Sequence, residues 1–383
     1  MLKEVVLLVG RFINPESKKP HIGGVQTYIN DLAALSTQNG AKAIVYELCM
    51  NSISRQAILV NGYEVRFIEV GREVKRSDFQ KAFDNIYKDE NGDGVVFIIA
   101  TDQFNVCSKA SNVITIQHGI AHDTPGPYCP GIWKFNKFLQ RSYKLLRCIK
   151  NARLFFHTKN TVCVDYNYFN WFRTLDTIYS GYKMHVVPNY ASGCITEEKL
   201  NSKLSKEGQK RKVVFARRFV LYRGTLLFAD VIEQLNKEGI IADFTFAGGG
   251  ELEEYVKNRF RNTPNVHFTK FLASESIDFH SQFDIAIVPT IWSEGTSLSL
   301  SEAMAAGCYP ICTHVGGMTN MILDGYNGRM CFPDANSVYN ALKEALLLNQ
   351  DNFNLVAKRA YMTSKISFSK KKWDEKWLSI LMS

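Results

Sequence analysis

Short apolar runs alternate with helical patterns from one end of the chain to the other. The first run, Val5–Val9, is typical of a buried strand. Gly23 and Gly24 then open a segment with apolar residues at helical spacing, which Gly40 is placed to end. Because this unit of strand, glycine turn and helix recurs, the pattern predicts parallel sheets with helices on both faces.

The same alternation continues through the N-terminal half. The stretch from Ile58 to Val70 alternates around Asn61-Gly62, a dipeptide typical of a β-hairpin turn. Three further apolar runs predict strands, at Val95–Ile99, Val113–Gln117 and Arg153–His157.

A polar stretch divides the chain, and the alternation resumes after it. The second half predicts strands from Val213, at Asp243–Ala247, Asn265–Phe268 and Asp284–Val288, and helices at Gly224–Lys237 and Ser297–Ala306. We expect an N-terminal domain over 1–189, a linker over 190–212, a C-terminal domain over 213–367, and a C-terminal helix over 368–383 that packs back on the first domain. The expected fold class is α/β, with two Rossmann-like doubly wound domains that face each other across a cleft.

Length and cysteine content agree with this organisation. A chain of 383 residues exceeds the ~250–300 residues that one hydrophobic core supports. Nine cysteines without a Cys-x-x-Cys pair fit neither a disulfide framework nor a zinc ribbon, so we expect a reducing compartment. The N-terminal apolar run is too short for a signal peptide, so the expected location is cytoplasmic.

The net charge of +9 is concentrated in one segment. Residues 124–164 contain no acidic residue and eight lysines and arginines, a distribution that favours an anionic partner. Within this segment, residues 132–149 read as an amphipathic helix. Its candidate membrane-binding residues are Trp133, Lys134, Lys137, Arg141 and Lys144. The alternative is an ordinary surface helix whose apolar face packs on the N-terminal sheet.

The stretch IWSEGTSLSLSEAMAAG is the most informative for chemistry. It follows a predicted strand, and small residues sit where the next helix begins, so the backbone N–H groups of Gly295, Thr296, Ser297 and Leu298 can bind a phosphate. Glu294 lies just before that helix. Glu302 lies inside it, where a carboxylate can accept hydrogen bonds from vicinal hydroxyls.

This stretch resembles the E-x7-E motif of the retaining family 4 glycosyltransferases of the two-domain B fold. The likeness continues through YPICTHVGGMTNMILDGYNGRMCFP. FARRFVLYRG resembles the family turn whose arginine and lysine hold the donor diphosphate, with Arg218 at the arginine and Arg223 in place of the lysine. Arg217 replaces a glycine of that turn.

Weaker likenesses extend the site. Gly23 and Gly24 resemble the N-terminal glycine turn that approaches the donor or acceptor, and Gly250 ends a glycine turn of the C-terminal domain. His118 resembles the family's histidine near the reacting sugar. Glu294 and His118 are therefore the candidate catalytic residues, and no metal or other cofactor is expected.

The resemblance implies a retaining, metal-independent hexosyltransferase that uses a UDP or GDP sugar. It also implies that the N-terminal domain over 1–189 binds the acceptor and that the C-terminal domain over 213–367 binds the nucleotide sugar. Its expected acceptor is a glycan or lipid-linked glycan in lipopolysaccharide, O-antigen or capsule biosynthesis. Such an enzyme would lie peripherally on the inner face of an anionic membrane. The alternatives are a nucleotide-sugar epimerase of related fold and a non-catalytic protein that binds nucleotide sugars or nucleic acid. Nucleic acid is disfavoured because no known motif accompanies the charge.

Overall fold

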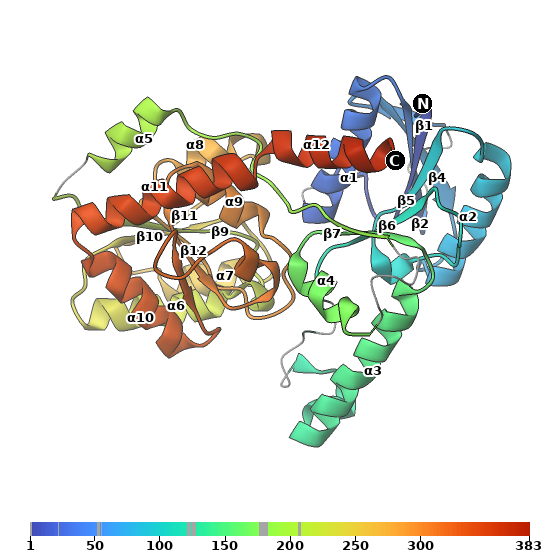
Figure 1. Ribbon diagram of the computed structural model, residues 1–383. Coiled ribbons are helices and arrows are strands. Elements are labelled where there is room, and N and C mark those ends of the chain that lie inside the picture. Colours follow the sequence, from blue (N-terminus) through green and yellow to red (C-terminus); the bar gives the residue numbers. More distant parts are fainter. Residues whose placement is uncertain are drawn as a thin grey trace. The chain divides into compact units, whose positions relative to one another are not determined.

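The computed structural model describes residues 2–21, 23–51, 54, 56–120, 123, 128–175, 183–205 and 208–383. These residues form two compact units (Figure 1). The first consists of the chain up to about residue 120, Cys129–Val187 and Asp374–Ser383. The second consists of Pro188–Trp373 with Asp123 and Tyr128.

The first unit is built on an eight-stranded sheet. The strands lie in the order β3-β4-β2-β1-β5-β6-β7-β8, and every neighbouring pair is parallel except β3 and β4. They are β1 (Glu4–Val9), β2 (Lys42–Cys49), β3 (Ile58–Val60), β4 (Tyr63–Glu69), β5 (Val95–Ile99), β6 (Val113–Gln117), β7 (Asn160–Cys163) and β8 (Lys183–Val186). The helical elements are α1 (Gly24–Gln38), α2 (Arg76–Glu90), η1 (Asp102–Phe104), η3 (Gly131–Lys134), α3 (Lys137–Phe155) and α4 (Tyr166–Arg173).

Apolar burial on both faces explains why β1 is a continuous apolar run. Phe79 and Phe83 of α2 join Val6 and Leu8 in one core cluster, while α1 buries its own apolar stripe. A strand covered on both faces has no polar side, as expected in a parallel sheet.

The second unit is built on a six-stranded, fully parallel sheet. The strand order is β11-β10-β9-β12-β13-β14. The strands are β9 (Lys212–Ala216), β10 (Asp243–Ala247), β11 (Val266–Thr269), β12 (Ile285–Val288), β13 (Tyr309–Thr313) and β14 (Arg329–Cys331). The helical elements are α5 (Glu197–Leu204), η4 (Leu221–Arg223), α6 (Thr225–Lys237), α7 (Glu253–Arg259), η5 (Ala273–Glu275), α8 (Ser276–His280), α9 (Leu298–Ala305), η6 (Gly316–Asn320), α10 (Ala335–Leu347) and α11 (Gln350–Ser367).

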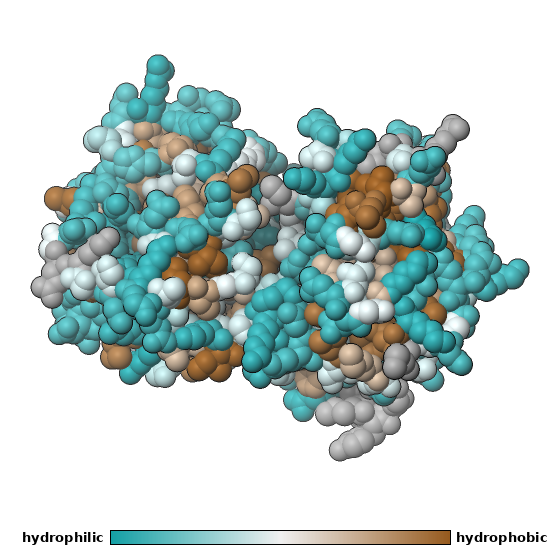
Figure 2. Space-filling view, turned by 90° about the horizontal axis from the view of Figure 1, so that it is seen from above, coloured by the Kyte–Doolittle hydropathy of each residue, from teal (hydrophilic) through white to brown (hydrophobic). Residues whose placement is uncertain are grey.

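Helices cover both faces of this second sheet. Phe228 of α6 and Val338 of α10 pack with Phe215 on one face, and Ala303 of α9 packs with Val214 on the other. The expected α/β class with two parallel-sheet units is therefore confirmed. In the space-filling view, hydrophilic side chains cover most of the visible face and apolar ones form separate patches (Figure 2).

The last helix, α12 (Lys370–Leu381), contributes its residues from Asp374 onward to the first unit. There the indole of Trp377 donates a hydrogen bond to the Tyr28 hydroxyl of α1 at 2.8 Å. Among the described residues, no helix combines the length and the apolar character that crossing a bilayer requires.

Three expectations from the sequence differ from the structure. Arg153–His157 is not a strand, because Arg153 to Phe155 complete α3 and the strand follows as β7. The aromatic run is buried by packing: Phe155 contacts Tyr168 and Phe172 of α4.

The predicted helix over 132–149 begins later, at Lys137. The side chain of Asn136 caps it by accepting a hydrogen bond from Leu139 N, and Gly131–Lys134 form a separate 3₁₀ turn. The expected linker over 190–212 is largely folded. It contains α5, whose Leu200 and Leu204 pack against Tyr361 of α11, so this segment belongs to the second unit.

Candidate active site

Loops at the carboxyl ends of neighbouring strands build the site in the second unit. The loop after β9 carries three arginines, and the loop after β12 carries Glu294. Phe219 N donates to Gly249 O, and Leu252 N donates to Phe219 O, so the loops after β9 and β10 are held together. A Cβ on Gly250 would lie 2.7 Å from Phe219 O, so Gly250 supports the arginine loop.

Glu294 is held by two guanidinium groups and a hydroxyl. Its Oε2 accepts hydrogen bonds from Arg217 Nη2 at 2.7 Å, from Arg223 Nη1, and from Thr290 Oγ1 at 3.2 Å. The side chains of Arg217 and Glu294 are only 6% and 10% exposed. Such charge-assisted bonds between side chains with little exposure fix the carboxylate in one place.

The cluster of Arg217, Arg223 and Glu294 carries one excess positive charge. Burial lowers the pKa of Arg217 to about 9. Burial, followed by repulsion from Arg217, lowers the pKa of Arg223 to about 9. Both guanidinium groups therefore stay charged at pH 7, and one carboxylate balances only one of them.

Arg218 is not one of the arginines that bind Glu294. Its side chain is exposed, and within the described part of the chain its guanidinium forms no hydrogen bond or ion pair. The sequence pattern selected Arg218 and Arg223, but the structure brings Arg217 and Arg223 to Glu294. No sequence signal distinguishes the two adjacent arginines, because only the path of the loop decides which one reaches the carboxylate.

The paired glycine after β13 fixes the backbone of Glu294. Gly317 N donates to Glu294 O at 3.0 Å. Gly316 has φ of +52°, and a Cβ there would lie 1.8 Å from the same oxygen. The close approach of the two loops therefore requires glycine at position 316.

The start of α9 is anchored by its own side chains. Ser297 is the N-cap and accepts from Leu300 N at 3.4 Å. Thr296 Oγ1 accepts from Asn189 N at 2.8 Å. Both side chains are buried, so only the backbone of Gly295–Leu298 is suited to contact an anion, as the first N–H groups of a helix have no carbonyl partner within it.

Glu302 lies on α9 and is half-buried. Its Oε2 accepts a hydrogen bond from Ser276 Oγ of α8 at 2.7 Å. Burial raises the pKa of Glu302 to about 7, which the Ser276 hydrogen bond opposes. A ligand that donated hydroxyl groups to this carboxylate would stabilise its charged form.

His118 and the N-terminal glycines lie in the first unit. His118 follows β6, and its Nε2 lies 2.9 Å from Ala100 O. The ring meets Tyr28 edge-on, with centroids 5.3 Å apart. Burial lowers the pKa of His118 to about 4, so the ring is neutral at pH 7. Gly23 is the N-cap of α1, and Gly24 is its first residue.

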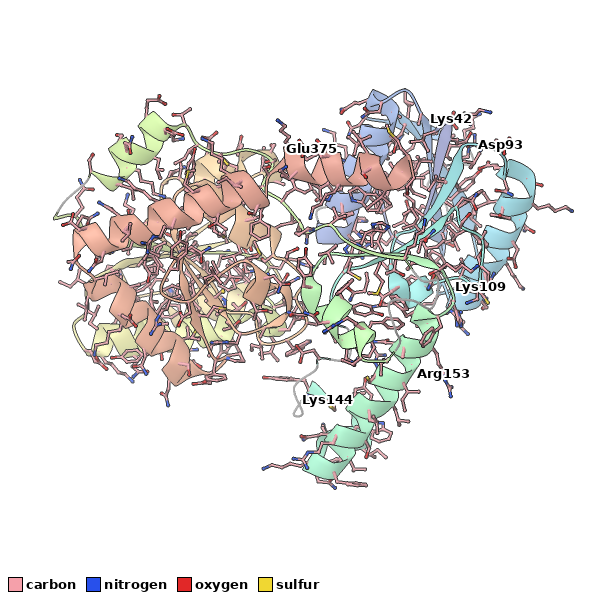
Figure 3. The ribbon with its side chains drawn as sticks, in the orientation of Figure 1. Lys42, Asp93, Lys109, Lys144, Arg153 and Glu375 are labelled. Carbon is pink, nitrogen blue, oxygen red and sulfur yellow. The ribbon has the colours of Figure 1, made fainter. Side chains whose placement is uncertain are left out.

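Apolar side chains project from the basic segment into solvent. Helix α3 buries only Asn151, Leu154 and Phe155, and it extends away from the sheet of its unit (Figure 1). The exposed large apolar residues here are Ile132, Phe135, Phe138, Leu145, Leu146 and Ile149. Trp133 packs against Tyr143. Lys134, Lys137 and Arg141 are exposed, and Lys144 is half-buried. Lys144 and Arg153 project from α3 in Figure 3.

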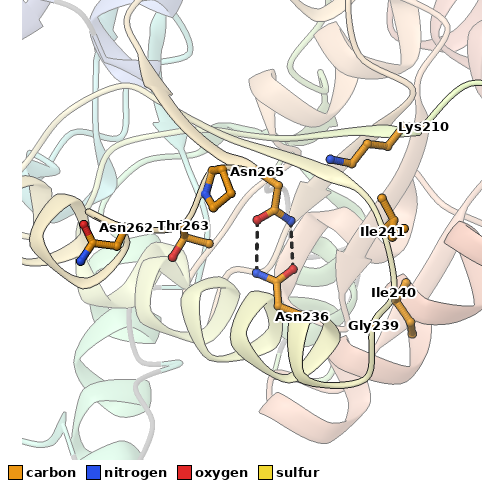
Figure 4. A pocket seen from close by; sticks show the side chains of 9 residues that line it. Lys210, Asn236, Gly239, Ile240, Ile241, Asn262, Thr263 and Asn265 are labelled. Atoms are coloured by element: carbon orange, nitrogen blue, oxygen red, sulfur yellow. Dashed lines mark hydrogen bonds between the residues drawn. The ribbon is translucent and has the colours of Figure 1, made fainter.

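A separate hollow of about 380 Å³ lies at the opposite edge of the second sheet. Its central feature is the amide pair of Asn236 and Asn265, whose side chains exchange two hydrogen bonds (Figure 4). It lies at the amino ends of the strands. Ligands of doubly wound sheets bind at the carboxyl ends, so we assign it no role.

Comparisons with known proteins show which families and folds the chain is similar to. Residues 210–347 match the model of a family described as glycosyl transferases group 1. An uncharacterized glycosyltransferase of Methanocaldococcus jannaschii is 30% identical over 148 residues, which are 38% of this chain and 39% of that protein. The chain therefore spans about two fifths of the length of this relative.

Solved structures match over the whole chain. Sucrose-phosphate synthase of Thermosynechococcus elongatus superposes with a TM-score of 0.73 at 14% identity, covering 99% of this chain and 98% of that one. HepE of Anabaena, solved with UDP-glucose, gives 0.65 at 11% identity, covering 99% of each chain. The chain therefore has the two-domain B fold of glycosyltransferases, and its second unit matches the group 1 glycosyltransferases.

Proposed function

We propose that the protein is a retaining, metal-independent family 4 hexosyltransferase. It moves a sugar from a UDP or GDP sugar to a glycan or lipid-linked glycan in lipopolysaccharide, O-antigen or capsule biosynthesis. The observation that carries this proposal is the buried Glu294, held by two arginines directly before the start of α9. The complex of HepE with UDP-glucose supports the choice of donor.

The donor diphosphate binds where positive charge is in excess. Arg218 is exposed and free to reach a phosphate, and Arg223 belongs to the cluster of net charge +1. The backbone N–H groups of Gly295–Leu298 add the positive end of α9. As the bond between sugar and phosphate breaks, negative charge grows on the diphosphate, and these preorganised groups stabilise it.

The two glutamates have separate roles in this proposal. Within the described residues, Glu294 uses only Oε2 for its protein partners, so Oε1 is available to a hydroxyl of the transferred sugar. Arg217 acts as a positioning residue because it holds Glu294 from the buried side. Glu302 accepts hydrogen bonds from the ribose hydroxyls of the nucleotide, which supply the partners that its buried carboxylate lacks.

His118, Gly23 and Gly24 are the candidate site residues of the first unit. A carbonyl oxygen can only accept, so Nε2 of the neutral His118 carries the proton that binds Ala100 O. Its Nδ1 is then an acceptor for a sugar hydroxyl. Gly23 and Gly24 leave the start of α1 without side chains, which allows a ligand to approach the backbone.

We also propose that the segment of η3 and α3 binds the inner face of an anionic membrane. The six exposed apolar side chains match an interfacial helix better than a packing helix. Lysines and arginines without any acidic residue over 124–164 suit anionic headgroups. A lipid-linked acceptor would lie at the same surface.

Nucleotide-sugar binding and turnover test the proposal in two steps. Thermal unfolding is measured with UDP, GDP and ADP sugars, because a ligand of the folded state raises its apparent stability. Release of nucleoside diphosphate is then measured with and without glycan acceptors in excess EDTA. We expect stabilisation by a UDP or GDP sugar and acceptor-dependent release, with the donor's anomeric configuration kept in the product by NMR.

Each alternative has its own outcome in the same experiment. Conversion of the donor sugar without an acceptor would identify an epimerase. Stabilisation without turnover for any acceptor would indicate a binding protein. Inversion of the anomeric centre would reject the retaining mechanism.

A further inference from the structure

The first unit contains a cavity of about 710 Å³ at the carboxyl edge of its sheet. Gly10 and Arg11 follow β1, Glu47 to Cys49 end β2 and are followed by Met50 and Asn51, and Phe104 follows β5. Strand β1 pairs with β2 on one side and with β5 on the other, so the strand order reverses there. Such a reversal opens a crevice that doubly wound sheets use for ligands.

A buried carboxylate holds the wall of this cavity in shape. Glu47 is 5% exposed. Its Oε1 accepts from Phe12 N at 3.0 Å, and its Oε2 accepts from Ile13 N at 2.9 Å. Within the described residues no basic side chain forms an ion pair with it. The loop after β1 is therefore fixed to β2, and each carboxylate oxygen keeps a lone pair for a hydroxyl donor.

Two further hydrogen bonds fix the loop after β1 at Arg11. Arg11 Nε donates to His21 Nε2 at 3.1 Å, and Gln26 Nε2 of α1 donates to Arg11 O at 2.8 Å. Because His21 Nε2 accepts this bond, it carries no proton, and the ring is neutral in this arrangement.

The lining combines apolar faces with hydrogen-bonding groups. The apolar lining residues are Ile13, Pro15, Leu48, Met50, Phe67, Val74 and Phe104. The polar ones are Arg11, His21, Glu47, Asn51 and Glu73. A pyranose ring presents both kinds of surface, with C–H groups on its faces and hydroxyls around its edge.

The charge of the lining selects among sugars. Arg11 contributes one positive charge, Glu47 and Glu73 contribute two negative ones, and His21 is neutral, so the sum is −1. A phosphate or carboxylate would be repelled. We propose that this cavity binds an uncharged pyranose ring, which under the proposed function is the terminal sugar of the glycan acceptor.

Saturation-transfer NMR with defined sugars tests the cavity. The probes are methyl glycosides of glucose, galactose, mannose, rhamnose and N-acetylglucosamine, with methyl β-glucuronide as the anionic match of methyl β-glucoside. Met50→Trp and Val74→Trp each narrow the cavity. Leu59→Trp is the matched control, because Leu59 is 76% exposed on β3 and does not line it.

We expect at least one neutral glycoside to bind the wild type and Leu59→Trp equally, and to bind both cavity variants at least tenfold more weakly. The cavity assignment is overturned if no neutral glycoside binds or if the cavity variants bind as well as the control. Stronger binding of the glucuronide than of the glucoside would overturn the charge argument. Stabilisation of the wild type by UDP, measured separately, reports on the proposed function and not on this cavity.

Discussion

Arg218 is the exposed cation beside the Glu294 cluster, and its proposed partner is the donor diphosphate. Arg218→Ala removes a charge-assisted hydrogen bond worth about 1.5–3 kcal/mol. Affinity for free UDP and for the UDP sugar should therefore fall by the same factor, about 10- to 150-fold. Isothermal titration calorimetry measures both ligands. Arg261→Ala is the control, because Arg261 is an exposed arginine that follows α7. A variant that lost affinity only for the sugar-bearing ligand would contradict the assignment.

Glu302 should make the stability of the ligand-free protein depend on pH. Its pKa is about 7 when folded, against a usual value of 4.5. Below pH 4.5 both folded and unfolded states hold the proton, and above pH 7 both have lost it. Between these values the folded state binds more protons, so stability falls as pH rises, by roughly 3 kcal/mol in total.

Glu302→Gln keeps the side-chain shape and cannot ionise, so it should remove this part of the pH dependence. The free energy of unfolding of wild type and variant is measured by urea titration at several pH values between 4 and 8. The free energy of unfolding of the variant, minus that of the wild type, should increase up to pH 7 and then stay constant. In the same variant, UDP affinity should fall, since an amide accepts ribose hydroxyls more weakly than a carboxylate does. Parallel pH curves for the two proteins would refute the buried, charged state of Glu302.

At the level of elements, the contact between the loops after β12 and β13 positions Glu294. Gly316→Ala introduces a Cβ 1.8 Å from Glu294 O, whereas Gly325→Ala, at a similar φ of +74°, meets nothing within 4 Å. Both substitutions carry the left-handed backbone cost of about 1–2 kcal/mol. Only Gly316→Ala should also displace Glu294, so its kcat should fall at least tenfold while Gly325→Ala keeps near wild-type kcat. Equal loss in both variants would show that the cause is backbone strain alone.

Helix α3 carries the membrane proposal. We expect the wild type to sediment with vesicles that contain phosphatidylglycerol and to be released by salt. The variant with Lys134, Lys137, Arg141 and Lys144 changed to glutamine should remain in the supernatant. A charge-matched control changes four exposed lysines elsewhere in the first unit, Lys3, Lys18, Lys19 and Lys88. If the control variant lost vesicle binding as fully as the α3 variant, the net charge of the protein rather than α3 would explain the attraction to the membrane.

At the level of the whole molecule, the two units should respond to different ligands. Each has its own sheet and its own core clusters, so a ligand of one unit protects mainly that unit's amides from exchange. In hydrogen-exchange mass spectrometry, UDP should protect peptides that cover the loops after β9 and β12. A neutral glycoside that binds should protect the peptide around Phe12 and Ile13. Protection by UDP confined to the first unit would exclude the second unit as the donor site.

The local pattern of the sequence determined much of the architecture. Strands such as β1 and β10 were predicted because a buried parallel strand is a short, continuous apolar run. The hairpin of β3 and β4 followed from Asn61-Gly62, and the start of α9 from the small polar residues before it. These signals are carried by neighbouring residues, so no knowledge of the fold was needed to recognise them.

Contacts between distant residues decided the rest. Phe155 ends a helix because Tyr168 and Phe172 pack on it, although its local sequence resembles a strand. Arg217 rather than Arg218 holds Glu294, 77 residues away, because the loop after β9 turns that side chain inward. The burial that shifts the pKa of Glu302 also results from contacts between distant residues, and so does the cavity beside Glu47. The sequence by itself determined most of the strands and helices and which chemical groups are present. Only the tertiary structure decided how ambiguous segments fold and which groups meet, because burial and contact depend on chain segments that local patterns do not connect.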